Sequence, residues 1–236
     1  MPSMKHLALV AALFVVADAA SAFDRYAGLA DTEHQPSDLS KALNLIMSTV
    51  TPDLYFHTRE LMVEDYEKAP INKALAVNVR EREYWQTTDQ DSKDVTGERA
   101  LEGCQLRFGS PCRLLVVNDE LAQPKEQSAE QDMPRLKYSG GFDINQLPIV
   151  KDDVRKRTDI QTYLSAQGPK AIAIHPIGQT FVVSGLPTDK DAADMALARC
   201  DVAPGRKKSD GPCYLYSLNN DVVTAQRQTF PSMLTR

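Results

Sequence analysis

The sequence predicts an α+β protein made of two duplicated β-β-α-β modules, each with an internal disulfide, plus an N-terminal helix. Three observations carry this prediction: short blocks recur at a nearly constant offset, the cysteines number four, and apolar residues follow strand periods and then helix periods. The composition, 42% apolar and 25% charged, is that of a globular protein and excludes collagen-like and fully disordered classes.

The repeated blocks keep one order along the chain. Lys73 and Lys170 are 97 positions apart, and Cys104 and Cys200 are 96 apart. The first copy contains KALAV (73–77), ALEGC (100–104) and PCRLLVVNDEL (111–121), and the second contains KAIAI (170–174), ALARC (196–200) and PCYLYSLNNDV (212–222). Matched blocks in one order predict an internal duplication, and two copies are too few for a solenoid array.

Each copy predicts two strands, a helix and a third strand, in that order. Runs rich in Ala, Val and Ile are typical of buried strands, and small or apolar residues then recur at helical spacing up to a cysteine. The expected strands are 73–79, 83–87 and 113–118 in the first copy and 171–175, 179–184 and 214–219 in the second. Pro176 and Gly178 predict a hairpin turn between two of these strands.

The cysteines predict two disulfides, Cys104–Cys112 and Cys200–Cys213, because each pair belongs to one copy. Each bond would join the end of the helix to the start of the next strand, and over such short loops would contribute at most roughly 3 kcal/mol. Metal sites favour C-x₂₋₄-C spacing, which is absent, so no metal ligands are expected. Lys73 and Lys170, which precede strands, are expected to mark exposed strand starts.

The N-terminus predicts a cleaved secretory signal at 1–22. Basic residues at Lys5 and His6 precede an apolar run at 7–17 and an Ala-Ser-Ala cleavage site at 20–22. The run is too short for the ~20 residues needed to cross a bilayer, so no stable membrane insertion is expected after cleavage. We therefore expect a periplasmic or secreted protein, a setting in which disulfides form.

Domain boundaries follow from the repeat and from composition. One N-terminal helix is expected at 37–50, where apolar residues recur at helical spacing before Pro52. A polar segment with two prolines separates the copies. The expected organisation is a signal peptide at 1–22, the N-terminal helix and first module at 23–121, a polar linker at 122–139, the second module at 140–228 and a tail at 229–236.

Sequence motifs for catalysis and cofactors are absent. The chain has no H-E-x-x-H, no G-x-S-x-G, no P-loop and no G-x-G-x-x-G, and its cysteines are assigned to disulfides. We therefore predict no catalytic residue, no cofactor and no metal site. His175, before Pro176, is expected to be a turn histidine. The net charge of −5 argues against nucleic-acid binding by phosphate neutralisation.

The aromatic pair Tyr84 and Trp85 is a possible partner contact, since aromatic residues are enriched in interface hot spots. Packing against the core is the competing interpretation. The sequence favours a non-enzymatic exported protein that binds an unknown protein or cell-envelope component. The alternative is an envelope enzyme whose site lies in a cleft between the modules, assembled from residues distant in sequence.

The repeated blocks KAxAI, ALxxC and PCxLYxxNN resemble those of exported α-proteobacterial proteins built from cysteine-linked modules, in the style of DUF4189-type domains. The resemblance is clearest over 170–223 and weaker over 73–121, where Gly103 and Leu115 depart from the pattern. It implies a periplasmic or secreted location. It implies no reaction, so no catalytic residue is carried over from it.

Overall fold

The computed structural model describes residues 37–52, 55–122, 136–205 and 211–226. Asp38–Arg236 forms one compact unit. The predicted signal peptide at 1–22, most of the expected linker at 122–139 and the expected tail at 229–236 lie outside the described residues. The chain is an α+β protein with two antiparallel sheets and two disulfides.

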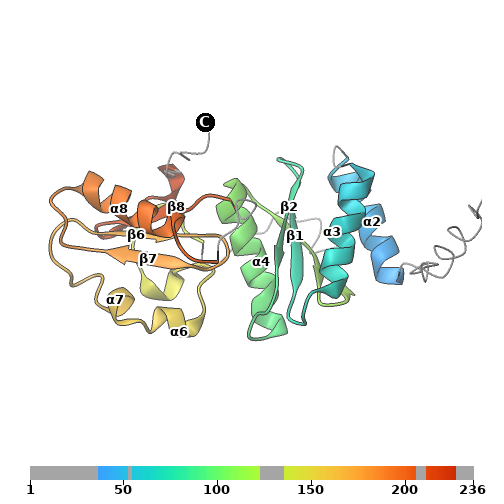
Figure 1. Cartoon of the computed structure of the whole chain (residues 1–236), viewed down its shortest axis with the longest axis horizontal. Helices are drawn as coiled ribbons and strands as arrows, with labels where there is room; N and C mark the ends of the chain where they lie inside the picture. The colour runs from blue at the N-terminus through green and yellow to red at the C-terminus, as the bar shows by residue number, and fades with distance from the viewer. Residues whose placement is uncertain (1–36, 53–54, 123–135, 206–210, 227–236) are drawn as a thin grey trace, which may run out of the picture. The chain divides into compact units, whose positions relative to one another are not determined.

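The first sheet has four antiparallel strands in the order β2-β1-β3-β4. Helices α2 and α3 lie on one face of this sheet and α4 lies on the other (Figure 1). The central strand β1 is buried along its whole length because both faces are covered. The elements are α2 (Asp38–Val50), α3 (Phe56–Lys68), β1 (Ala74–Asn78), β2 (Glu83–Thr87), α4 (Lys93–Phe108), β3 (Arg113–Val117) and β4 (Glu120–Leu121).

The second sheet has five strands in the order β5-β9-β8-β6-β7, also antiparallel. Helix α8 covers one face, and the short helices α6 and α7 lie toward the other (Figure 1). The elements are β5 (Gly140–Gly141), α6 (Asp152–Arg155), α7 (Thr158–Gln161), β6 (Ala171–Ile174), β7 (Thr180–Val183), α8 (Asp189–Asp201), β8 (Tyr214–Leu218) and β9 (Asp221–Val222), with 3₁₀ turns at Ile144–Gln146 and Thr224–Gln226.

Helix α3 corrects the sequence prediction, which placed a single helix before the first strand. Only Met62, Val63 and Tyr66 of its thirteen residues are buried, whereas Phe56 and Leu61 are exposed. The apolar stripe that identifies an amphipathic helix is therefore too weak to read from this segment. The helix expected at 37–50 is confirmed as α2.

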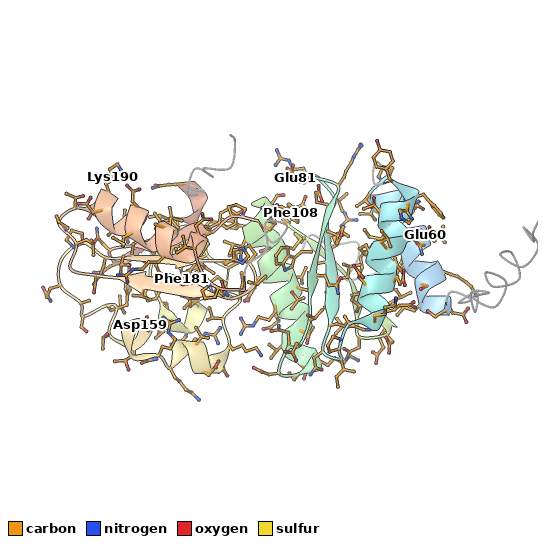
Figure 2. All side chains as sticks on the ribbon, viewed as in Figure 1. Glu60, Glu81, Phe108, Asp159, Phe181 and Lys190 are labelled. Carbon is orange, nitrogen blue, oxygen red and sulfur yellow. A yellow bond between two sulfur atoms is a disulfide. The ribbon has the colours of Figure 1, made fainter. Side chains whose placement is uncertain are left out.

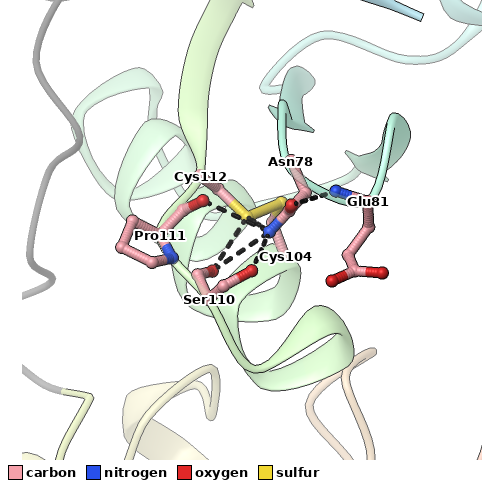
Figure 3. Close-up of a disulfide and its surroundings, with 6 residues drawn as sticks. All are labelled: Asn78, Glu81, Cys104, Ser110, Pro111 and Cys112. Atoms are coloured by element: carbon pink, nitrogen blue, oxygen red, sulfur yellow. Dashed lines mark hydrogen bonds between the residues drawn. A yellow bond between two sulfur atoms is a disulfide. The ribbon is translucent and has the colours of Figure 1, made fainter.

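Both predicted disulfides are present. Cys104–Cys112 and Cys200–Cys213 each span 6.1 Å between Cα atoms and join the last turn of α4 or α8 to the start of β3 or β8. Figure 3 shows the first bond beside Asn78, whose side-chain amide donates to Ser110 Oγ at 2.7 Å. The loop between helix and strand is thus held by a covalent bond and by side-chain hydrogen bonds.

Lys73 and Lys170 are buried, which contradicts the expectation of exposed strand starts. Each ammonium lies over a tyrosine ring, Tyr66 at 5.0 Å and Tyr163 at 5.3 Å, and donates to a backbone carbonyl of the preceding segment at 2.7 and 2.9 Å. These contacts replace the water that a buried cation loses. Burial also raises the pKa of both tyrosine hydroxyls, so they stay protonated.

Asn118 and Asn219 occupy matching turns. Both are left-handed, with φ of 52° and 55°, a conformation that asparagine tolerates better than most residues. The side-chain oxygen of Asn118 accepts from the backbone N–H of Lys73 at 3.1 Å, and that of Asn219 accepts from Lys170 at 3.3 Å. In each sheet the turn is therefore hydrogen-bonded to the residue that precedes β1 or β6.

Candidate functional site

Strand β2 carries the two aromatic residues that the sequence singled out. Tyr84 packs toward the core under α2 and α3, whereas Trp85 packs toward the core under α4. The two side chains point to opposite faces of the sheet because successive residues of a strand alternate. Both are half-buried, so they form no shared aromatic patch. Burial raises the pKa of the Tyr84 hydroxyl.

Trp85 lies against helix α4 at Gly103. A Cβ added at Gly103 would come within 2.9 Å of Trp85 Cδ1, well inside contact distance. In the second half of the chain the corresponding positions hold Arg199 on α8 and Phe181 on β7; of these two residues, Figure 2 labels Phe181. The glycine therefore makes room for the Trp85 indole.

Two hollows lie beside β2, and we refer to them as the β2 hollows. The larger, about 350 Å³, is lined by 83–86 and by Arg107, Phe108 and Ile177. The smaller, about 140 Å³, is lined by 85–88, Gln90, Arg99, Ile149, Pro176 and Ile177. Together they contact every residue of β2. Ile177 borders both from the turn between β6 and β7, and its side chain is 45% exposed.

A buried ion pair stands behind the smaller hollow. Arg99 and Glu102 of α4 are 3% and 0% exposed, and Arg99 Nη1 donates to Glu102 Oε2 at 2.9 Å. The same oxygen accepts from the backbone N–H of Ile149 at 2.6 Å. Ile149 has φ of 68°, a strained conformation for a β-branched residue. Arg99 Nε has no partner among the described residues, so this buried guanidinium keeps an unused donor.

A third hollow, about 450 Å³, shares Gln90, Ile149 and Ile177 with the smaller β2 hollow. Two cations on its wall are already paired. Lys151 Nζ lies 3.4 Å from Asp91 Oδ1, and Arg157 Nε lies 3.1 Å from Asp159 Oδ1. The charges of these two cations on the wall of the third hollow are therefore compensated.

His175 is a structural turn residue. It is fully buried, its Nε2 lies 3.1 Å from the Gly211 carbonyl oxygen, and the backbone N–H of Ile177 donates to its Nδ1. Asn78, at the end of β1, likewise bonds to the turn before its disulfide and to the N–H of Glu81. His175 and Asn78 thus have the same role, since each follows or ends a buried strand and binds the turn before a disulfide.

The three hollows have no histidine or cysteine in their walls. Over the ranges that the structure describes, no group of three His, Cys, Asp or Glu side chains is arranged to hold a metal ion. Within those same ranges, no helix combines the length and apolarity needed to span a bilayer.

Sequence analysis identified Tyr84 and Trp85 but missed Arg99, Glu102 and Ile177. An Arg-x-x-Glu pair on a helix is normally a solvent-exposed pair, so nothing local marked it as buried. One signal was available. When the similar blocks ALEGC and ALARC are aligned, Met195 and Ala198 stand at the positions of Arg99 and Glu102, so the ion pair is a difference between the two blocks.

No protein-family model, no curated protein and no solved structure matches this chain.

Proposed function

We propose that the protein is exported to the bacterial periplasm or beyond and acts without catalysis, binding a partner through strand β2 and the β2 hollows. The sequence at 1–22 supports export, and the two disulfides suit an oxidising compartment. The observation that carries the binding proposal is an edge strand bordered by hollows along its whole length.

We further propose that the two sheets descend from one duplicated β-β-α-β module. The support is a set of matching contacts beyond the sequence blocks themselves. Strands β1 and β6 each pair with a strand on both sides. The pairing of β1 with β3 shifts register between Leu75 and Ala76, and that of β6 with β8 shifts between Ile172 and Ala173. The matched Tyr–Lys and Asn–Lys contacts and the matched disulfides add independent correspondences.

Ile177 is the side chain with which to test binding. It is a large apolar residue, it borders all three hollows, and it is exposed. An exposed apolar side chain inside a bordered hollow can bury its surface only against a ligand or partner. Leu164, 50% exposed and absent from the walls of the hollows, is a matched control.

The test is a pull-down from periplasmic extract of the organism that encodes the chain, using the mature protein and the variants Ile177→Asp and Leu164→Asp. We expect the wild type and Leu164→Asp to retain the same protein or envelope component, and Ile177→Asp to lose it, because a buried carboxylate in the interface is costly. Equal retention by all three proteins would contradict the proposed binding surface.

An envelope enzyme remains the second candidate function. The observation in its favour is that the hollows are lined from both sheets, as a site assembled from distant segments would be. Turnover of a model ester, peptide or glycoside by the mature protein, lost in Ile177→Asp, would favour this candidate over binding.

A further inference from the structure

Among the described strands, β2 is the edge left open for another strand. β4 and β5, which end the two sheets, are only two residues long. The edge strand β7 is partly covered, because Arg157 Nη1 donates to the Thr180 carbonyl oxygen at 2.9 Å. β2 has five residues and pairs only with β1. A strand of that length presents roughly 16 Å of unpaired backbone, at about 3.3 Å per residue.

The space beside β2 suits an extended segment rather than a folded partner. The β2 hollows follow the strand from Glu83 to Thr87, and their far wall is formed by Ile149, Pro176 and Ile177. A single extended chain can lie between these walls and pair with the edge. A second copy of this sheet would bring its own covering helices, for which hollows of about 350 and 140 Å³ offer no room.

The charges around the hollows indicate an uncharged segment. The smaller β2 hollow is lined by Arg99, which is paired with Glu102, and the larger is lined by one charge of each sign, Glu83 and Arg107. An added carboxylate near Arg99 would lie close to the buried Glu102 carboxylate and be repelled by it. A backbone carbonyl oxygen carries no net charge and can still accept from Arg99 Nε, the buried donor that lacks a partner.

Resting on the proposed function, we infer that the β2 hollows bind an extended, uncharged segment of a partner polypeptide, which adds to the sheet as a strand beside β2. Backbone hydrogen bonds to the edge supply affinity, and an apolar side chain of the segment against Ile177 supplies selectivity. One carbonyl oxygen of the segment accepts from Arg99, which the Glu102 carboxylate holds in place while accepting from the backbone N–H of Ile149.

The probe is a library of random linear dodecapeptides displayed on phage, panned on the mature disulfide-bonded protein and, in parallel, on Ile177→Asp. We expect peptides rich in Val, Ile, Thr and Tyr, without acidic residues, to be enriched on the wild type alone. A synthetic copy of the best peptide is then added during hydrogen–deuterium exchange. The amides of 83–88 should exchange roughly tenfold more slowly, the effect of adding ladder hydrogen bonds, while those of β7 stay unchanged.

The role of Arg99 is tested with the double variant Arg99→Gln/Glu102→Gln, which removes both buried charges and keeps an acceptor for the Ile149 N–H. It should bind the peptide roughly tenfold more weakly, the loss of about one hydrogen bond to a charged donor. Comparison of its melting curve with that of the wild type checks that it folds.

Several results would overturn the inference. These are no enrichment on the wild type relative to Ile177→Asp, selection of acidic peptides, no slowing of amide exchange at 83–88, or a dimer by light scattering that Gln86→Pro dissociates. Any of them can occur while the pull-down still depends on Ile177, so failure of strand addition is distinguishable from failure of the proposed binding function.

Discussion

At the scale of single residues, Gly103 of α4 and Trp85 of β2 form a close contact between the helix and the first sheet. Gly103 stands in the middle of α4, where glycine costs about 1 kcal/mol relative to alanine. The lost helix propensity is offset by packing of the Trp85 indole, which occupies the space that a Cβ at this position would need. A Cβ at Gly97, on the same helix, would approach no closer than 3.2 Å to Leu114 Cδ2 and 3.4 Å to Val117 Cγ2, which makes Gly97 a matched control.

We predict that Gly103→Ala destabilises the protein by about 1–3 kcal/mol, because Trp85 must move from a packed position. Gly97→Ala gains the same helix propensity without that clash and should be neutral or stabilising by up to about 1 kcal/mol. Urea unfolding followed by circular dichroism measures both. Equal effects of the two substitutions would show that the Trp85 contact has no energetic weight.

Among the secondary-structure elements, α4 and α8 are each joined to the following strand by a disulfide. Each begins at a side-chain cap, Ser92 accepting from Val95 N–H and Thr188 accepting from Asp191 N–H. Each ends next to a disulfide that closes a short loop, with sequence separations of 8 and 13. The caps set where the helices begin and the bonds set where the chain returns to the sheet.

We predict that denatured, unreduced mature protein has no titratable thiols and that reduction exposes four. Paired Cys→Ser replacement of Cys200 and Cys213 should lower the free energy of unfolding by up to about 3 kcal/mol, and replacement of Cys104 and Cys112 by somewhat less, since its loop is shorter. Guanidinium unfolding of each pair variant makes the comparison. Four titratable thiols before reduction would show that the protein does not form these two disulfides.

Across the whole described unit, α4 belongs to the first sheet but also contacts residues around the second. Leu106 joins the core cluster that contains Ile172 and Tyr216, and Tyr214 Oη donates to the Arg107 carbonyl oxygen at 2.9 Å. Glu102 accepts from the Ile149 N–H on the same side. The ion pair is thus part of the packing between segments far apart in sequence.

We predict that Glu102→Ala lowers the free energy of unfolding by about 3–5 kcal/mol, because it leaves Arg99 buried without its carboxylate and the Ile149 N–H without an acceptor. Glu102→Gln keeps an acceptor and should cost less. Urea unfolding of both variants gives the difference. If Glu102→Ala were as stable as Glu102→Gln, the lost hydrogen bond to Ile149 would carry no weight.

The sequence by itself determined the α+β class, the disulfide partners and the turn role of His175. These features depend on residues close in the chain or on repetition, both of which a sequence records directly. Tertiary structure alone decided that Lys73 and Lys170 are buried, that α3 covers the first sheet, and that Arg99, Glu102, Ile149 and Ile177 meet beside β2. Burial and proximity between distant segments arise from packing, which leaves no periodic signal in the chain.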